Sequence, residues 1–192
     1  MQSARLQLEV LYLYANTEAD NQAEFLLLFR TASRLIMSIK SLHDTTNIAS
    51  YSPIYLSTSL SLASFTLFRM MKSRFTQTLE ESIAEDGKYS LFVGIHILKQ
   101  MSIANNDVCA KSAEMLSIMW TNQTIFKMSD YGTLWTLRIR NRLSMSVVFD
   151  TVLIWIEQYG YCSGGAALSL QQSNGKINHG QELSKIGAKY SL

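Results

Sequence analysis

Cysteine, proline and glycine are scarce in this chain of 192 residues, and each scarcity excludes a class of structure. The only two cysteines, Cys109 and Cys162, are far apart, so the chain encodes neither a disulfide framework nor a thiolate metal cluster. Pro53 is the only proline, and no glycine precedes Gly87. Because glycine and proline supply the commonest turns, the first half of the chain is predicted to form long, uninterrupted helices.

The chain also lacks a strong charge of either sign, since its formal net charge is +2 at pH 7. A nucleic-acid-binding surface usually shows as a strongly basic face, so no direct DNA binding by this chain is expected. The N-terminal residues lack the basic-then-apolar pattern of a signal peptide, and we expect an intracellular, reducing compartment. Hydrophobic residues make up 47% of the sequence, which together with the length predicts one globular domain, with or without a tail.

Apolar periodicity predicts an all-α fold, a multi-helix, orthogonal or bundle-like single domain that covers residues 1–160. Its most regular stripe repeats at alternating spacings of four and three, as Leu56, Leu60, Ala63, Leu67 and Met70. Turn-forming residues cluster at the expected connections, which are 44–47, 85–87 and 105–107. The expected helices lie at about 5–15, 21–43, 53–74, 76–83, 88–103, 110–126 and 141–160.

The helix expected at 53–74 lies largely within an uncharged run, 45–68, so a membrane-spanning helix is one interpretation of this segment. Its many hydroxyl groups and its proline favour instead a buried core helix with a close-packed face of small residues, and no membrane contact is expected. The cations Arg69, Lys72 and Arg74 are expected in its last turn, where they oppose the negative end of the helix dipole. The small residues of the close-packed face are Ser57, Ser61 and Ser64.

The composition changes after Gly160, since six of the nine glycines lie between Gly160 and Gly187 and no apolar stripe continues. A segment that buries so little apolar surface does not offset its ordering entropy. Residues 161–192 are therefore predicted to form a flexible C-terminal tail.

The most distinctive stretch, 137–160, combines the densest cluster of cations with the most apolar segment of the chain. Arginines occupy three alternate positions and precede an apolar run, 147–156, that only Asp150 and Thr151 interrupt. The simplest interpretation is a buried element that carries one carboxylate. The three arginines are Arg138, Arg140 and Arg142.

Helix and strand compete for this apolar run, because its β-branched residues favour a strand and its length favours a helix. We predict a helix, since Asn141 or Ser144 can cap its start and Gly160 can adopt the left-handed conformation that commonly ends a helix. A helix that is apolar on all sides is expected to lie at the centre of a core.

A buried carboxylate at Asp150 requires a cationic or hydrogen-bonding partner. In a structural interpretation, this partner is Arg138 or Arg140 folded back from the preceding loop, or a cation from another helix, and the other arginines point to water. In a functional interpretation, Arg138, Arg140 and Arg142 converge on an anion, since guanidinium groups make forked contacts with carboxylates. The ligand would then be a small acidic metabolite.

Short motifs along the chain occur in an order that resembles a known family. They are Pro53-Ile54-Tyr55, Met71-Lys72-Ser73, Gly87-Lys88, Asn106-Asp107 before Trp120, and Arg138-x-Arg140-x-Arg142-Leu143-Ser144-Met145-Ser146-Val147-Val148-x-Asp150 followed by Trp155. Over roughly residues 6–160 the chain resembles the C-terminal regulatory (middle homology) region of fungal binuclear-zinc-cluster transcription factors. Within that family, it resembles in particular the branched-chain amino-acid and weak-acid-response regulators.

This resemblance implies a non-catalytic regulatory domain, located in the nucleus, that controls transcription by sensing a small acidic effector or by contacting other transcription-factor subunits or co-regulators. The family's DNA-binding module needs six cysteines and is therefore absent, so the chain is expected to be a fragment, a truncated paralogue or an incomplete gene product. The alternative is a helical protein–protein interaction scaffold derived from such a factor, without effector binding.

The sequence shows no pattern typical of a catalytic, cofactor or metal site, and none of these is expected. His43, His96 and His179 fall in different segments without a companion at metal-ligand spacing. Cys109 lies near a helix start, which can lower a thiol pKa, but without a nearby histidine it is expected to be a packed residue. A hydrolase or transferase ranks third among the functions, because no nucleophile–base pair is present.

Overall fold

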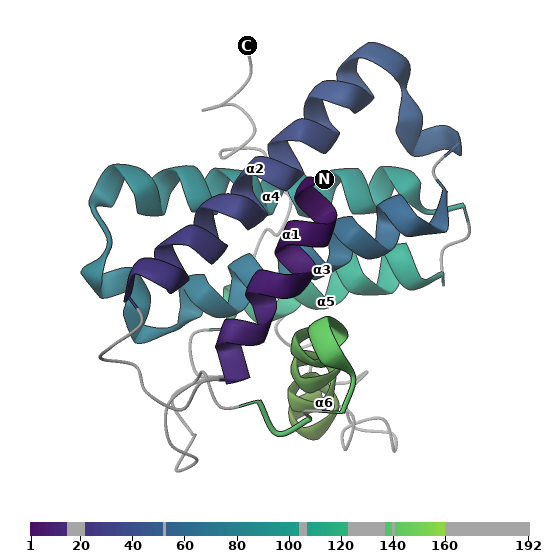
Figure 1. The fold of residues 1–192 in the computed structure, drawn as a ribbon. Helices are drawn as coiled ribbons and strands as arrows, with labels where there is room; N and C mark the ends of the chain where they lie inside the picture. The colour runs from purple at the N-terminus through teal and green to yellow at the C-terminus, as the bar shows by residue number, and fades with distance from the viewer. Residues whose placement is uncertain (15–21, 52, 104–106, 123–136, 140, 160–192) are drawn as a thin grey trace. The chain divides into compact units, whose positions relative to one another are not determined.

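The apolar stripes of the sequence form helices in the computed structural model, which describes residues 1–14, 22–51, 53–103, 107–122, 137–139 and 141–159 (Figure 1). Within these ranges no strand occurs, and the predicted all-α fold is confirmed. The α-helices are α1 (Gln2–Glu9), α2 (Gln22–Thr46), α3 (Ile54–Lys72), α4 (Glu81–Met101), α5 (Val108–Thr121) and α6 (Ser146–Tyr159). Short 3-10 helices are η1 (Val10–Tyr14), η2 (Ile48–Tyr51), η3 (Arg74–Thr78) and η4 (Leu143–Met145).

The chain divides into two units, Met1–Ile154 and Trp155–Leu192. The first unit contains α1 to α5 and most of α6. In the second unit only residues 155–159 are described, where the rings of Trp155 and Tyr159 stack with their centroids 6.0 Å apart. The prediction of a flexible tail at 161–192 lies outside the described residues.

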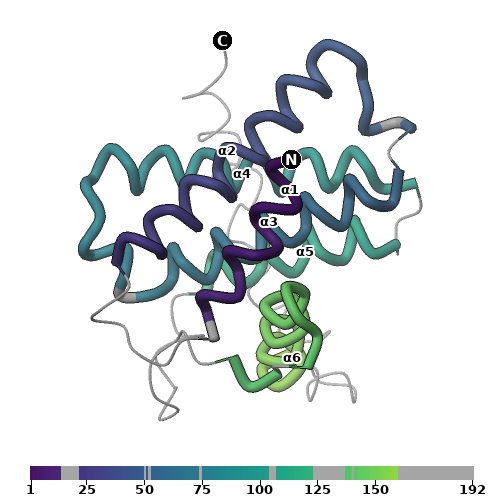
Figure 2. The backbone as a smooth tube through the Cα atoms, viewed as in Figure 1, coloured from purple at the N-terminus to yellow at the C-terminus, as the bar shows by residue number. Residues whose placement is uncertain are grey.

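Helix α3 is the centre of the first unit, as its stripe predicts. Every residue from 59 to 70 is buried, and the helix packs against α2, α4 and α5. The backbone trace in Figure 2 shows α3, α4 and α5 side by side with α2 across them. Among the described residues, none of the helices combines the length and the apolar character that crossing a bilayer requires.

The predicted face of small residues on α3 lets α4 approach closely. Ser61 and Ser64 are buried and Ser57 is half-buried. A Cβ atom placed on Gly94 of α4 would lie 2.5 Å from the Ser64 hydroxyl oxygen, so this crossing requires glycine. The Ser64 hydroxyl of α3 therefore lies directly against Gly94 of α4, as expected for a close-packed face of small residues.

The turn predicted at 85–87 is wrong, because Gly87 lies inside α4. The short helix predicted at 76–83 is replaced by η3 and by the first turn of α4. A Cβ atom on Gly87 would overlap the buried ring of Phe29 in α2. Gly87 is therefore needed for close packing between two helices and not for a turn.

The loop predicted at 44–47 is also partly wrong, since α2 continues to Thr46. The hydroxyl groups of Thr45 and Thr46 donate to the Leu42 carbonyl, at 3.0 and 2.6 Å, within the helix itself. Threonine hydroxyls can draw backbone groups out of a helix, but these two hydroxyls bind a carbonyl of the preceding helical turn, and the helix continues. The chain leaves the helix at Asn47, whose φ of 51° is left-handed.

Candidate functional site

Helix α6 begins at Ser146, later than its predicted caps Asn141 and Ser144, because η4 comes first. The Ser146 hydroxyl accepts a hydrogen bond of 3.1 Å from the main-chain amide of Arg142. Just before α6, Leu143 has a left-handed φ of 49°. The arginine stretch is thus joined to α6 by a tight turn.

The prediction that α6 is buried on all sides is wrong. Between Ser146 and Ile154, the buried residues lie on one helical face and are Ser146, Val147, Asp150 and Thr151. Phe149, on another face, is 45% exposed. The Thr151 hydroxyl donates to the Val147 carbonyl at 2.6 Å, so this polar side chain is satisfied within the helix. α6 therefore buries one face between Ser146 and Ile154, and Asp150 lies on that face.

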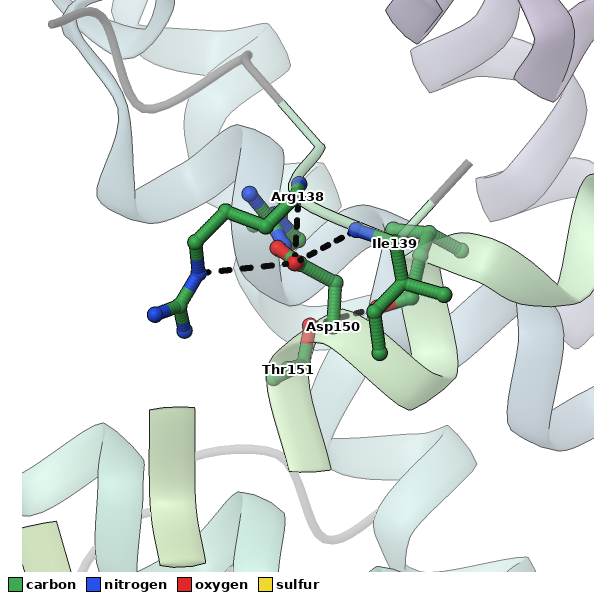
Figure 3. Close-up of polar contacts among 6 residues, drawn as sticks. Arg138, Ile139, Asp150 and Thr151 are labelled. Atoms are coloured by element: carbon green, nitrogen blue, oxygen red, sulfur yellow. Dashed lines mark hydrogen bonds and ion pairs between the residues drawn. The ribbon is translucent and has the colours of Figure 1, made fainter. Parts of the chain in front are cut away.

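Asp150 is 1% exposed and binds groups from two other segments (Figure 3). One carboxylate oxygen, Oδ2, accepts a hydrogen bond of 2.5 Å from Nη1 of Arg69 in α3. The other, Oδ1, accepts from the main-chain amides of Arg138 and Ile139, at 3.0 and 3.3 Å. The Arg138 side chain adds a longer ion pair, with Nε 3.7 Å from Oδ1. We call these four residues the Asp150 cluster.

The Asp150 cluster joins parts of the chain that are distant in sequence. Arg69 and Asp150 are 81 residues apart, and Arg138 and Asp150 are 12 apart. Charge-assisted hydrogen bonds of this kind are among the stronger polar contacts in proteins. The carboxylate therefore fixes segment 137–139 to α3 and α6.

Sequence reasoning missed Arg69, which it placed in the last turn of α3 as a partner of the helix dipole. In the structure Arg69 is buried and bound to Asp150, a cation from another helix. Burial lowers the pKa of the Arg69 guanidinium, Asp150 raises it, and the charge of Arg138 lowers it. A signal was present in the sequence, because Arg69 continues a spacing of three and four from the apolar residues Leu62 and Phe65.

The structure describes two of the three arginines that were predicted to converge on an anion, Arg138 and Arg142. The Arg138 side chain is 36% exposed beside Asp150. Arg142 is exposed, and its guanidinium carbon lies 5.6 Å from the centre of the Phe149 ring. Arg140 lies outside the described residues. Of the two described arginines, only Arg138 lies beside the buried carboxylate, so it is the candidate anion-binding residue.

Lys72, another cation predicted to face the dipole of its own helix, contacts α5. Its Nζ donates a hydrogen bond of 2.8 Å to the Trp120 carbonyl and lies 4.7 Å from the centre of the Trp120 ring. Burial lowers the pKa of Lys72. The ammonium group thus satisfies one of the terminal carbonyls of α5, which lack partners within that helix.

The other candidate groups that the structure describes are not among the partners of Asp150. The Nδ1 atom of His43 accepts a 3.4 Å hydrogen bond from the Ala49 amide, His96 is exposed, and His179 is outside the described residues. In the described part of the chain, no group of three or more His, Cys, Asp or Glu side chains is placed to hold a metal ion. Cys109 is half-buried in the first turn of α5.

Cys109 is expected to react slowly with alkylating reagents. Burial raises the pKa of its thiol, although a hydrogen bond with Ser57 opposes this, and a raised pKa leaves less thiolate at a given pH. In a Cys162→Ser background, iodoacetamide should modify Cys109 more slowly in the folded protein than in urea-unfolded protein at the same pH. Faster modification of the folded protein would show that the thiol is activated.

No known protein family, no curated protein and no solved structure matches the chain. The chemistry of the described residues and the resemblance of the motifs are therefore the basis for a proposal about function.

Proposed function

We propose that the chain is a non-catalytic regulatory domain of the fungal zinc-cluster transcription-factor type, which binds a small acidic effector at Arg138. The resemblance over residues 6–160 supports the type of domain. The single observation that supports effector binding here is that the Arg138 side chain is partly exposed beside the buried Arg69–Asp150 pair.

The charges of the Asp150 cluster favour an anion beside Arg138. Arg69 binds Asp150 at 2.5 Å, and the Arg138 Nε atom forms a longer ion pair with the same carboxylate at 3.7 Å, so two cations share one carboxylate. The positive charges of Arg69 and Arg138 repel each other. A carboxylate on the exposed side of Arg138 would reduce this repulsion and accept forked hydrogen bonds from the guanidinium.

Binding at Arg138 would act on the main chain of the same residue. The amide groups of Arg138 and Ile139 donate to Asp150, which in turn binds Arg69 in α3. An acid that orders the Arg138 side chain therefore favours the state in which 137–139, α3 and α6 are joined. A ligand shifts a conformational equilibrium only by binding one state more tightly. In this proposal the acid binds Arg138 more tightly when segment 137–139 is held by Asp150.

In this proposal the domain acts in the nucleus and passes the effector signal to other transcription-factor subunits or co-regulators, without contacting DNA itself. It performs no reaction and needs no cofactor.

At least one small carboxylic acid is expected to raise the melting temperature of the chain. At ten times its Kd, a ligand that binds only the folded state stabilises it by about 1.4 kcal/mol. For a chain of this length, that corresponds to a shift of about 3–6 °C. The measurement is thermal unfolding with acetate, benzoate, succinate or citrate, at ionic strength matched with sodium chloride.

Arg138→Gln is the decisive variant, because the main-chain amide bonds to Asp150 remain while the guanidinium is lost. It should melt close to the wild type without ligand and show no acid-dependent shift. The matched control is Arg34→Gln, which removes an exposed arginine of α2 and should keep the shift. Equal shifts in both variants would reject Arg138 as the effector site.

The alternative function, a protein-interaction scaffold without effector binding, is favoured by one observation. Large apolar side chains are exposed where α3 begins, including Ile54 at 84% and Tyr51 at 79%. If no acid shifts the melting temperature while substitutions such as Ile54→Ser abolish partner binding, the scaffold is the better account.

A further inference from the structure

One face of α6 exposes apolar side chains beside a cation. Phe149 is 45% exposed, and Val152 and Leu153, three and four residues further along the helix, are half-buried. The Arg142 guanidinium lies over the Phe149 ring at 5.6 Å. Leu143, next to Arg142, is 73% exposed. We call these five residues the Phe149 face.

Leu143 is an independent sign that this surface is used. Its φ of 49° is left-handed, a conformation that leucine adopts at a cost and that glycine or asparagine would accept more readily. The leucine side chain at this strained position is mostly exposed to solvent and gains little from burial in its own chain. Strained backbone of this kind is found preferentially at functional sites.

We propose that the Phe149 face binds an amphipathic segment of a partner protein that carries acidic residues next to apolar ones. The single charged side chain of the face is Arg142, so charge complementarity selects a carboxylate on the partner. Apolar residues at positions i, i+3 and i+4 of α6 match the face that a helical peptide presents at the same spacing. Aromatic and arginine side chains are also the commonest anchors of such interfaces.

This site is separate from the proposed effector site. It uses the Arg142 side chain and the outer face of α6, whereas the effector site uses the Arg138 side chain at the inner face. Either proposal can therefore fail without the other. A small acid alone lacks the apolar surface that Phe149 and Leu143 would cover, so the occupant of the Phe149 face is a peptide segment.

A selection from a display library of random helix-length peptides on the whole chain tests the proposal. The selected peptides should combine acidic and apolar residues. Their affinity should fall by about tenfold or more for Phe149→Ser and for Arg142→Glu, and it should weaken with salt. Arg34→Gln, which removes an exposed arginine of α2, is the matched control and should bind them normally.

Three results would overturn the proposal. The first is that no selected peptide loses affinity for Phe149→Ser although circular dichroism shows the variant folded. The second is selection of basic or uncharged peptides by the Phe149 face. The third is sedimentation of the wild type as a dimer that Phe149→Ser dissociates, because the occupant would then be a second copy of the chain. If Phe149→Ser is unfolded, Phe149→Leu with Arg142→Glu replaces it under the same criteria.

Discussion

Asp150→Ala is expected to lower the free energy of unfolding by about 3–5 kcal/mol, as removal of one partner from a buried ion pair usually does. The substitution leaves the Arg69 guanidinium buried without its counter-charge and removes the acceptor of the Arg138 and Ile139 amides. Urea unfolding of the wild type and the variant, followed by circular dichroism, measures the difference.

Two controls separate loss of the charge pair from loss of packing. Asp150→Asn keeps the shape and an acceptor oxygen and should cost less than Asp150→Ala. The double variant Arg69→Met with Asp150→Leu replaces both charges by apolar groups and should recover much of the stability, since such replacements are often neutral or stabilising. An Asp150→Ala protein as stable as the wild type would show that the Asp150 cluster does not hold the fold.

Gly87→Ala is expected to destabilise the protein by about 1–3 kcal/mol, the usual range for overpacking a core. Alanine is the better helix former by about 1 kcal/mol, so an exposed glycine in a helix would show the opposite sign. Here the added methyl group overlaps three atoms of the Phe29 ring, which is itself buried and cannot move into solvent.

The variant Phe29→Leu provides the background that isolates this overlap. With the ring removed, Gly87→Ala should become neutral or stabilising when measured against Phe29→Leu alone. A destabilisation of the same size in both backgrounds would contradict the explanation that the Phe29 ring excludes a Cβ atom at Gly87.

The helices could be predicted from the sequence because their apolar residues repeat at helical spacing. α3 is the clearest case, since its stripe predicts a central buried helix and the structure shows one. The same reasoning failed at Gly87, where a residue typical of turns serves close packing against Phe29. The spacing of α4 does not reveal which residue of α2 will lie opposite.

The candidate site was predictable only in part, because its main contact spans 81 residues. The sequence identifies Asp150 as a carboxylate that needs a partner. It does not show which of the distant cations becomes that partner, because local spacing brings none of them near. Arg69 is buried in α3, and only the folded chain, which brings it to Asp150 of α6, selects it. The exposed face around Phe149 was not predicted. The sequence of α6 is apolar on all sides, and it does not show which side faces solvent.

We propose that a small acid binds the Arg138 guanidinium and acts through the Asp150 cluster. The most direct test is a titration of the isotope-labelled chain with the acid that gives the largest thermal shift, followed by NMR of the arginine Nε–Hε groups and the backbone amides. The Arg138 Nε–Hε resonance and the Arg138 and Ile139 amide resonances are expected to shift together, while the Arg34 side-chain resonance stays unchanged. If the Arg138 resonances move no more than those of Arg34, the acid binds elsewhere and the proposal is wrong.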